Sequence, residues 1–365
     1  MTRIHFIPII HAGNIVTMED MVPLIILSSP FLVMFVVIAI SLHLWRGHVE
    51  DPEQEVEQEQ RVRKEIRVLR SVNYHFTRKC NYKCGFCFHT EKTSFVLPID
   101  QIRKGLKILA DAGMKKLNLS GGEPFLYAPL IGQILQYCKE ELGLESVSIV
   151  SNGSKIREDF FKKYGKYLDI LAVSVDSFDD ETNRGIGRGK GNHLPQMRRV
   201  ADWCRRYDVL FKVNTVVNIY NWDEDMNMEI ASLAPIRWKC FQVLLVDTEN
   251  AGTEAIRNAE RFLITDEQFD AFLDRHKEQK SLVPESNRIM KSSYVILDEY
   301  MRFLNKGDRY EESQSILDVP LEQAIAGIDF DEGAFTERLG VYEWTKPGAG
   351  GCGAAAAGGS KELDW

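Results

Sequence analysis

Short apolar runs alternate with longer amphipathic segments through the middle of the chain. Six runs rich in β-branched and aromatic residues predict strands. They cover residues 72–76, 117–119, 146–150, 170–175, 209–217 and 240–246. Apolar residues at helical spacing predict helices between them, at 99–112, 129–141, 155–167, 192–207 and 223–233. The clearest is 99–112, where Ile102, Leu106 and Leu109 share one face and Gly113 follows the last turn.

This alternation of strand and helix predicts a parallel sheet with right-handed crossovers. Six strands are too few for an eight-stranded barrel, so a partial (β/α)6 barrel is expected over residues 71–246, with a doubly wound sheet as the alternative. After residue 246 the pattern turns helical, at 266–278 and 286–305. We therefore expect a C-terminal helical extension, residues 247–345, that caps the barrel.

The N-terminal segment differs from the rest of the chain. Residues 21–45 contain no Asp, Glu, Lys or Arg and are long enough as a helix to cross a bilayer, although Pro23 and Pro30 interrupt them. A membrane anchor is favoured over monotopic insertion or a buried helix. Residues 1–45 are thus expected to associate with a membrane, and residues 46–70 to form a charged linker. Basic residues within 61–70 favour a catalytic domain on the cytosolic side.

Charge and cysteine content narrow the class of protein. The chain has 45 Lys and Arg against 53 Asp and Glu, a formal charge of −8. This argues against a nucleic-acid-binding protein, while a local basic pocket for one anion stays possible. Seven cysteines in 365 residues are too few, and odd in number, for a disulfide scaffold.

Polar residues lie where five of the predicted strands end, and the carboxyl ends of parallel strands carry the chemistry in barrels. The first strand leads into Cys80, Cys84 and Cys87, a CxxxCxxC triplet. Three thiolates on one loop suit an iron-sulfur cluster, and a 4Fe-4S cluster with three cysteine ligands leaves one iron free for a small molecule. The alternative is a zinc site with His75 or His89 as the fourth ligand.

The triplet resembles that of the radical S-adenosylmethionine (SAM) superfamily. Longer runs, SVNYHFTRKCNYKCGFCFHT, SGGEPFL, SVSIVSNGS and LVPESN among them, resemble the viperin family of interferon-inducible antiviral enzymes over about residues 71–345. This resemblance implies a radical SAM partial barrel with a 4Fe-4S cluster and SAM as cofactors. It also implies dehydration of a nucleoside triphosphate, CTP or UTP, to a 3′-deoxy-3′,4′-didehydro form that terminates viral RNA chains.

The resemblance also implies roles for single residues. Cys80, Cys84 and Cys87 would hold the cluster. Residues of the second to fourth strand ends would bind SAM: Ser120, Gly121, Gly122, Glu123, Ser151, Asn152, Asp176 and Ser177. Glu123 would face the SAM ammonium, and the glycines would allow close backbone approach. Each of these could instead form only a tight turn or a helix cap.

Cationic and polar residues near the strand ends offer a site for a triphosphate. The candidates are Lys116, Arg188, His193, Lys212, Asn214, Arg237 and Lys239, which match the family's substrate-binding positions. Taken alone, each cation could be a solvated surface charge. The loop from Arg188 to His193 is about two residues shorter than in animal viperins, and it is no Walker A loop.

Tyr294 lies in the segment predicted to be helical, where an aromatic residue is usually part of the core. The resemblance matches it to a tyrosine near the reacting sugar. It is therefore the candidate catalytic residue, relaying a proton or an electron.

The C-terminal residues 346–365 form a Gly/Ala-rich tail, expected to be flexible, that ends in Leu363-Asp364-Trp365. This ending resembles the signal read by the cytosolic iron-sulfur assembly machinery. The resemblance further implies attachment to the cytosolic face of the endoplasmic reticulum membrane and to lipid droplets. The animal family, however, carries an amphipathic helix at its N-terminus, whereas residues 21–45 are apolar all round. A second function remains open, that of a membrane-tethered antiviral interaction protein whose cluster is structural.

Overall fold

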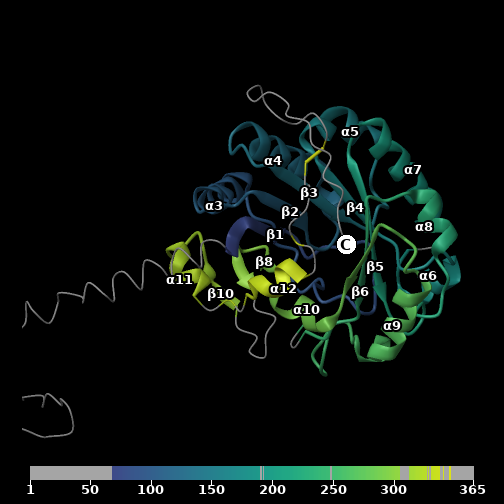
Figure 1. Ribbon diagram of the computed structural model, residues 1–365. Coiled ribbons are helices and arrows are strands. Elements are labelled where there is room, and N and C mark those ends of the chain that lie inside the picture. The colour runs from purple at the N-terminus through teal and green to yellow at the C-terminus, as the bar shows by residue number, and fades with distance from the viewer. Residues whose placement is uncertain are drawn as a thin grey trace, which may run out of the picture. The chain divides into compact units, whose positions relative to one another are not determined.

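A curved sheet organises the computed structural model, and its strands form a partial barrel (Figure 1). The structure describes residues 68–346 except 190, 192, 247–248, 305–311, 327, 329, 338–339 and 341–344. These residues form ten strands in the order β10-β9-β8-β1-β2-β3-β4-β5-β6-β7. The strands are β1 Ser71–His75, β2 Lys116–Ser120, β3 Ser146–Ser151, β4 Ile170–Ser174, β5 Leu210–Val217, β6 Arg237–Gln242, β7 Leu282–Glu285, β8 Val295–Leu297, β9 Arg302–Leu304 and β10 Glu312–Ser315.

Strands β1 to β7 run parallel, and β8 joins the other side of β1, also in parallel. Only β9 and β10 are antiparallel to their neighbours. The carboxyl ends of eight strands therefore open on one mouth.

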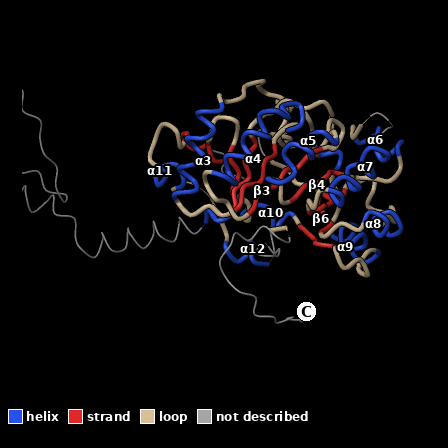
Figure 2. The backbone as a smooth tube through the Cα atoms, turned by 90° about the horizontal axis from the view of Figure 1, so that it is seen from above, coloured by secondary structure: helices blue, strands red, loops and turns tan. Residues whose placement is uncertain are grey.

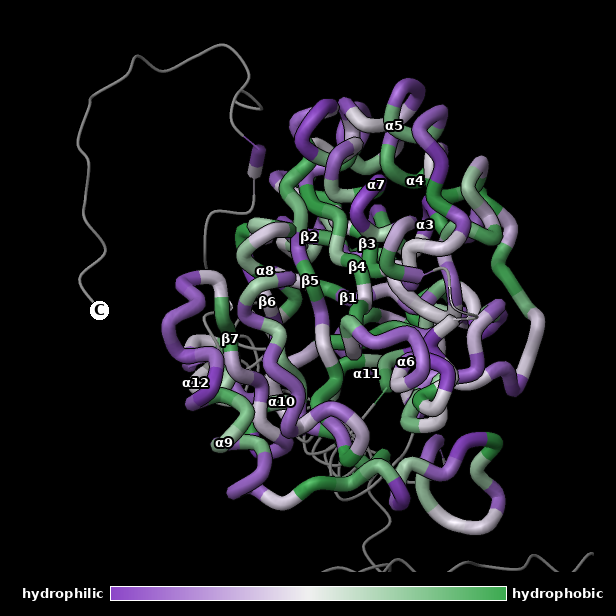
Figure 3. The backbone as a smooth tube through the Cα atoms, turned by 90° about the vertical axis from the view of Figure 1, so that its right-hand side faces the viewer, coloured by the Kyte–Doolittle hydropathy of each residue, from purple (hydrophilic) through white to green (hydrophobic). Residues whose placement is uncertain are grey.

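Helices surround the strands, as the view from above shows (Figure 2). They are α3 Ile99–Asp111, α4 Ala128–Glu140, α5 Glu158–Tyr164, α6 Asp180–Ile186, α7 His193–Arg206, α8 Asn227–Leu233, α9 Asp266–Arg275, α10 Asn287–Ser292, α11 Leu321–Ile325 and α12 Glu332–Glu337. Hydropathy is highest along strands such as β2, β3 and β4 (Figure 3). The core thus lies between the outer face of the sheet and the helices.

Helix α3 shows why the sequence folds this way. Ile102, Leu106 and Leu109 have no exposed surface, and they form one stripe at intervals of four and three residues. Gly105 lies in the same stripe, where an added Cβ would lie 2.9 Å from Met301 Sδ. Close packing of this face against the sheet and the β8–β9 turn fixes the helix.

The predicted partial barrel, its first five strands and its helices are confirmed, with small shifts at their ends. The sixth strand begins earlier than predicted, at Arg237. The helix predicted over 286–305 is wrong, because only Asn287–Ser292 is helical and strands β8 and β9 follow. Val295 to Leu297 form a short apolar run that pairs with β1, and periodicity alone cannot distinguish such a strand from a helix. The extension therefore adds strands to both edges of the sheet.

Both ends of the chain fall outside the described residues. This applies to the predicted membrane segment 1–45, to nearly all of the linker 46–70 and to the tail that ends in Trp365. Leu69 is fully buried, so the folded unit begins before residue 71. Among the helices that the structure describes, none combines the length and apolarity needed to cross a membrane.

We predict that Leu106→Ala lowers the free energy of unfolding by about 2–5 kcal/mol, because the lost methyl groups leave a cavity under α3. Gln101→Ala changes an exposed residue on the same helix, and we expect its free energy of unfolding to stay within about 0.5 kcal/mol of the wild-type value. Urea denaturation of both variants measures this. Equal stability of the two would show that α3 does not pack as described.

Candidate active site

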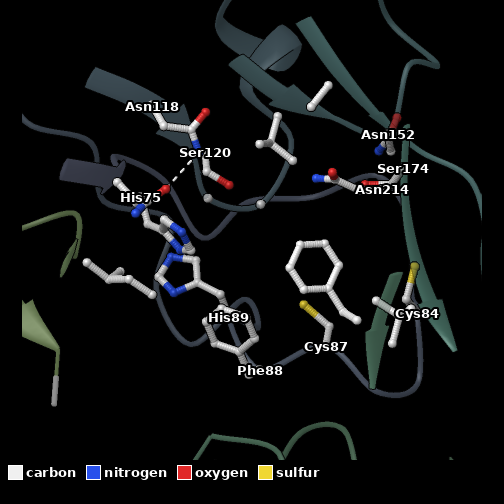
Figure 4. A pocket seen from close by; sticks show the side chains of 18 of the residues that line it. His75, Cys84, Cys87, Phe88, His89, Asn118, Ser120, Asn152, Ser174 and Asn214 are labelled. Atoms are coloured by element: carbon white, nitrogen blue, oxygen red, sulfur yellow. Dashed lines mark hydrogen bonds between the residues drawn. The ribbon is translucent and has the colours of Figure 1, made fainter. Parts of the chain in front are cut away.

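A cavity of ≈ 400 Å³ lies inside the barrel, bounded by residues that point inward from the strands and by the loop that carries the cysteines. Figure 4 shows Asn118, Ser120 and His75 on one side, Asn152 and Asn214 across from them, and Cys84 and Cys87 below. Of the predicted site residues, fifteen line this cavity. They are Cys80, Cys84, Cys87, Lys116, Ser120, Gly121, Gly122, Ser151, Asn152, Asp176, Arg188, Lys212, Asn214, Lys239 and Tyr294.

The loop with the three cysteines is held by backbone hydrogen bonds to the end of α6. The Lys83 amide donates to Gly187 O at 3.2 Å, and the Gly85 amide donates to Ile186 O at 2.9 Å. An added Cβ on Gly187, whose φ is +88°, would lie 2.3 Å from Lys83 O. The side chain of Asn250 donates to Phe86 O at 2.9 Å from the other side. The loop is therefore shaped by its neighbours.

The three thiols fit an iron-sulfur cluster. Burial raises the pKa of Cys80 to about 11 and that of Cys84 to about 12, and the positive charge of Arg188 opposes both shifts. Metal binding must therefore release protons from these thiols. No group of three His, Cys, Asp or Glu side chains within the described part of the chain converges as a single metal ion requires. Three thiols on one loop, in place of two separated pairs of ligands, suit an iron-sulfur cluster better than structural zinc.

The Gly121-Gly122 turn packs directly against the chain that leads into Cys80. The Gly122 amide donates to Thr77 O at 2.7 Å, and the Glu123 amide donates to Lys79 O at 2.8 Å. An added Cβ would lie 2.3 Å from Thr77 O at Gly121 and 2.1 Å from Lys79 O at Gly122. The glycines thus allow the β2 exit to position the cysteine loop.

Glu123 has no exposed surface and does not line the cavity. Its carboxylate accepts hydrogen bonds from Ser151 Oγ at 2.8 Å, the Asn152 amide at 2.7 Å and the Phe125 amide at 2.9 Å. Burial raises its pKa, and these donors oppose the shift. In this structure Glu123 positions the β3 exit, and its contact with a SAM ammonium stays a prediction.

Asp176 and Arg188 form a buried ion pair beside the cysteines. Arg188 Nε lies 2.7 Å from Asp176 Oδ2, and the Val216 amide donates to Asp176 Oδ1 at 3.0 Å. Arg188 therefore lies next to the cluster loop as well as in the cavity wall. Ser177 has no exposed surface, does not line the cavity, and accepts from the Asp179 amide in a turn before α6.

His193 and Arg237 are not brought to the cavity. His193 is buried behind β4, with Nε2 3.0 Å from Ser174 O, and burial lowers its pKa to about 4. A neutral imidazole supplies no positive charge to a phosphate. Arg237 shares a face of β6 with Lys239 by alternation but lies at the amino end of the strand.

The cavity wall is strongly basic although the chain is acidic. Lys116, Lys212 and Lys239 are each less than a tenth exposed and point inward from three strands. The lining includes seven Lys or Arg side chains against two Asp or Glu side chains, and Arg78, Arg188 and Lys239 are paired with buried carboxylates. A buried positive field of this kind attracts a multiply charged anion.

Lys239 joins Tyr294 to a buried carboxylate. Its Nζ donates to Tyr294 Oη at 2.9 Å and forms a short ion pair with Glu285, which has no exposed surface. Tyr294 does not lie on a helix, as the sequence predicted, but in the link between α10 and β8. Because β8 pairs with β1, this link places the phenol at the cavity.

A hydrogen-bonded row of polar side chains crosses the inside of the sheet. Asn73 Nδ2 donates to Val295 O at 3.1 Å, Asn118 Nδ2 donates to Asn73 Oδ1 at 2.8 Å, and Ser148 Oγ donates to Asn118 Oδ1 at 2.8 Å. The site residues predicted from the sequence lie at strand ends and do not include this row. The signal was present, because polar residues at alternate positions of a buried parallel strand are unusual.

Comparison with known proteins identifies relatives along most of the chain. The family model described as the radical SAM superfamily matches residues 74–234. An S-adenosylmethionine-dependent nucleotide dehydratase RSAD2 from Oncorhynchus mykiss is 58% identical over 281 residues, 76% of this chain and 81% of that protein. An S-adenosylmethionine-dependent nucleotide dehydratase from Thermoplasmatales archaeon (strain ISO4-H5) is 35% identical, over 76% of this chain and 98% of its own.

Solved structures show the same fold at low sequence identity. Streptococcus suis SuiB bound to S-adenosylmethionine matches with a TM-score of 0.54 and 14% identity, over 84% of this chain and 78% of that chain. This likeness supports the architecture alone.

We predict that Gly122→Ala lowers the iron and sulfide content of the purified protein several-fold, because its Cβ would displace the chain before Cys80. Gly185→Ala is the matched control, since an added Cβ there meets no atom within 4 Å. Iron and sulfide assays after anaerobic purification measure the effect. Equal cluster content in both variants would contradict the role assigned to this turn.

Proposed function

This chain belongs to the S-adenosylmethionine-dependent nucleotide dehydratases of the radical SAM superfamily, and from that premise we propose that it dehydrates a pyrimidine nucleoside triphosphate inside its barrel. The product would be the 3′-deoxy-3′,4′-didehydro nucleotide. CTP is the first candidate substrate and UTP the second.

One observation carries this proposal. The cavity wall joins three cysteines of one loop to seven Lys or Arg side chains, the buried Lys116 and Lys212 among them, in a protein whose formal charge is −8. A triphosphate is a polyanion that such a wall would bind, and it would present its sugar to the cysteine side. The polar row of Asn73, Asn118 and Ser148 offers amide and hydroxyl groups for the uncharged parts of a nucleotide.

When bound, a 4Fe-4S cluster and SAM supply a 5′-deoxyadenosyl radical, which removes a hydrogen atom from the substrate. Cys80, Cys84 and Cys87 would hold the cluster, and residues at the exits of β2, β3 and β4 would bind SAM beside it. The protein's own residues contribute by positioning the substrate relative to the cluster and SAM. Buried lysines would fix the phosphates, so that the ribose 4′ hydrogen faces the radical carbon.

Loss of the 3′ hydroxyl as water requires a proton. Tyr294 is the proposed donor, because its hydroxyl lies in the cavity wall and accepts a hydrogen bond from Lys239. The Lys239 ammonium, held by Glu285, can return a proton to the phenolate that this donation leaves. One further electron, from the external reductant, converts the radical cation left on the sugar to the product, and one proton from solvent restores Lys239.

The second candidate function, a tethered interaction protein with a structural cluster, is compatible with the first. The predicted membrane segment 21–45 supports it. The proposed attachment to the cytosolic face of the endoplasmic reticulum, to lipid droplets and, through Trp365, to the iron-sulfur assembly machinery rests on the sequence at the two ends.

We predict that anaerobically reconstituted protein with dithionite and SAM forms 5′-deoxyadenosine well above background when CTP or UTP is added. The Cys84→Ala variant should form none, because it lacks a cluster ligand. Failure of CTP, UTP and GTP alike to stimulate the wild type would show that the nucleotide proposal is wrong. An antiviral effect that survives in Cys84→Ala would favour the interaction protein.

We predict that Tyr294→Phe reduces formation of the dehydrated nucleotide by about 10²-fold to 10⁴-fold, because the variant lacks the proton donor. Cleavage of SAM should continue, since the cysteine loop is untouched. Tyr300→Phe, outside the cavity lining, is the control and should retain activity. Chromatography of nucleotide and 5′-deoxyadenosine in one reaction measures both. Normal product yield from Tyr294→Phe would rule out the relay.

A further inference from the structure

The partial barrel has a seam, because β7 and β8 do not pair with each other. Strand β7 lies at the edge next to β6, and β8 lies on the far side of β1. Only α10 connects the two along the chain. No strand pairing among the described residues therefore closes the barrel here, so side chains that cross between its two sides can affect the width of the mouth.

A buried arginine bridges this mouth. Arg78, two residues before Cys80, is 2% exposed. Its Nε donates to both carboxylate oxygens of Glu299, at 2.9 and 3.1 Å, and its Nη1 and Nη2 donate to Glu249 at 3.1 and 3.0 Å. Glu249 follows the exit of β6, and Glu299 lies in the turn after β8. One guanidinium thus joins three segments that come from both sides of the seam.

We propose that Arg78, with Glu249 and Glu299, forms a clamp that sets the width of the barrel mouth and so positions substrate against the cysteine loop. Arg78 is a positioning residue in this proposal. Its catalytic consequence rests on the proposed function, whereas its mechanical role does not.

Neighbouring contacts support a built clamp. Lys92 Nζ lies 3.2 Å from Glu249, and Thr93 Oγ1 donates to Glu299 at 3.3 Å. Phe95 stacks on Tyr300 with ring centroids 4.7 Å apart and an interplanar angle of 7°. Thr93 and Phe95, which follow the cysteines, therefore contact the same turn after β8 that Arg78 bonds.

The geometry requires arginine. Nη1 and Nη2 together bond Glu249 while Nε bonds both oxygens of Glu299, an arrangement on one planar guanidinium that a lysine ammonium cannot reproduce. The two elements that carry Lys239 and Tyr294, β6 and the link to β8, continue into the two carboxylates. Release of the clamp should therefore change the relative position of the cation wall and the proposed proton donor.

Hydrogen exchange of the reconstituted full chain tests the clamp without reference to activity. In Arg78→Lys we expect about tenfold faster exchange at the amides of Glu249, Asn250 and residues 298–301, because their local opening becomes easier. Glu249→Gln should show the same pattern with every positive charge retained. Arg198→Lys, at an exposed ion pair with Glu229, is the control and should exchange as the wild type. Unchanged exchange in Arg78→Lys would overturn the proposal, whatever the activity.

The catalytic consequence is measured in the same preparations. We expect Arg78→Lys to keep its iron content, yet to yield about tenfold less dehydrated nucleotide per 5′-deoxyadenosine formed, because misplacement of substrate is costly. Faster hydrogen exchange in Arg78→Lys, with an unchanged ratio of dehydrated nucleotide to 5′-deoxyadenosine, would overturn the positioning role. If nucleotides do not stimulate 5′-deoxyadenosine formation by the wild-type protein, the proposed function is wrong. The hydrogen-exchange data would still test whether Arg78 holds the two segments together.

Discussion

Burial of polar and charged side chains on the inner face of a parallel sheet is the constraint on which this structure depends. The interior of a full (β/α) barrel is normally filled by branched apolar side chains. Here the inward positions of β1, β2 and β3 carry Asn73, Asn118 and Ser148. Buried polar groups are costly unless they are hydrogen-bonded, so the row of bonds between these residues is needed for the fold. The result is a polar cavity in place of a packed core.

The cavity is useful because the strand exits are fixed around it. Backbone hydrogen bonds from Gly122 to Thr77 and from Glu123 to Lys79 position the cysteine loop. The Glu123 carboxylate fixes the β3 exit, and the ion pair of Asp176 and Arg188 connects β4 to that loop. Each of these groups has protein partners in the structure. They act as supports that hold the cysteines at one side of the cavity and the buried lysines within reach of a common ligand.

The architecture and the cysteine site could be predicted because they follow from local patterns. The periodicity of apolar residues predicts the partial barrel, and the CxxxCxxC triplet predicts the cluster loop. Features set by contacts between distant parts of the sequence were not predicted. Strand β8 was predicted to be helical, because a three-residue apolar strand has no distinctive period. Glu285 and the clamp residues Arg78, Glu249 and Glu299 could not be found, since their partners lie 46 to 221 residues away in sequence. His193, expected beside the phosphates because it follows a glycine-rich loop, is instead buried with Nε2 near Ser174 O, and its contact with substrate stays a prediction.

The central claim is that the barrel holds the sugar of a nucleotide against the carbon radical formed beside Cys80, Cys84 and Cys87. The most direct measurement uses CTP or UTP carrying deuterium at the ribose 4′ position, with mass spectrometry of the 5′-deoxyadenosine formed. The account predicts transfer of one deuterium from the 4′ position and none from a substrate labelled in the base. Formation of unlabelled 5′-deoxyadenosine from the 4′-deuterated nucleotide would contradict it.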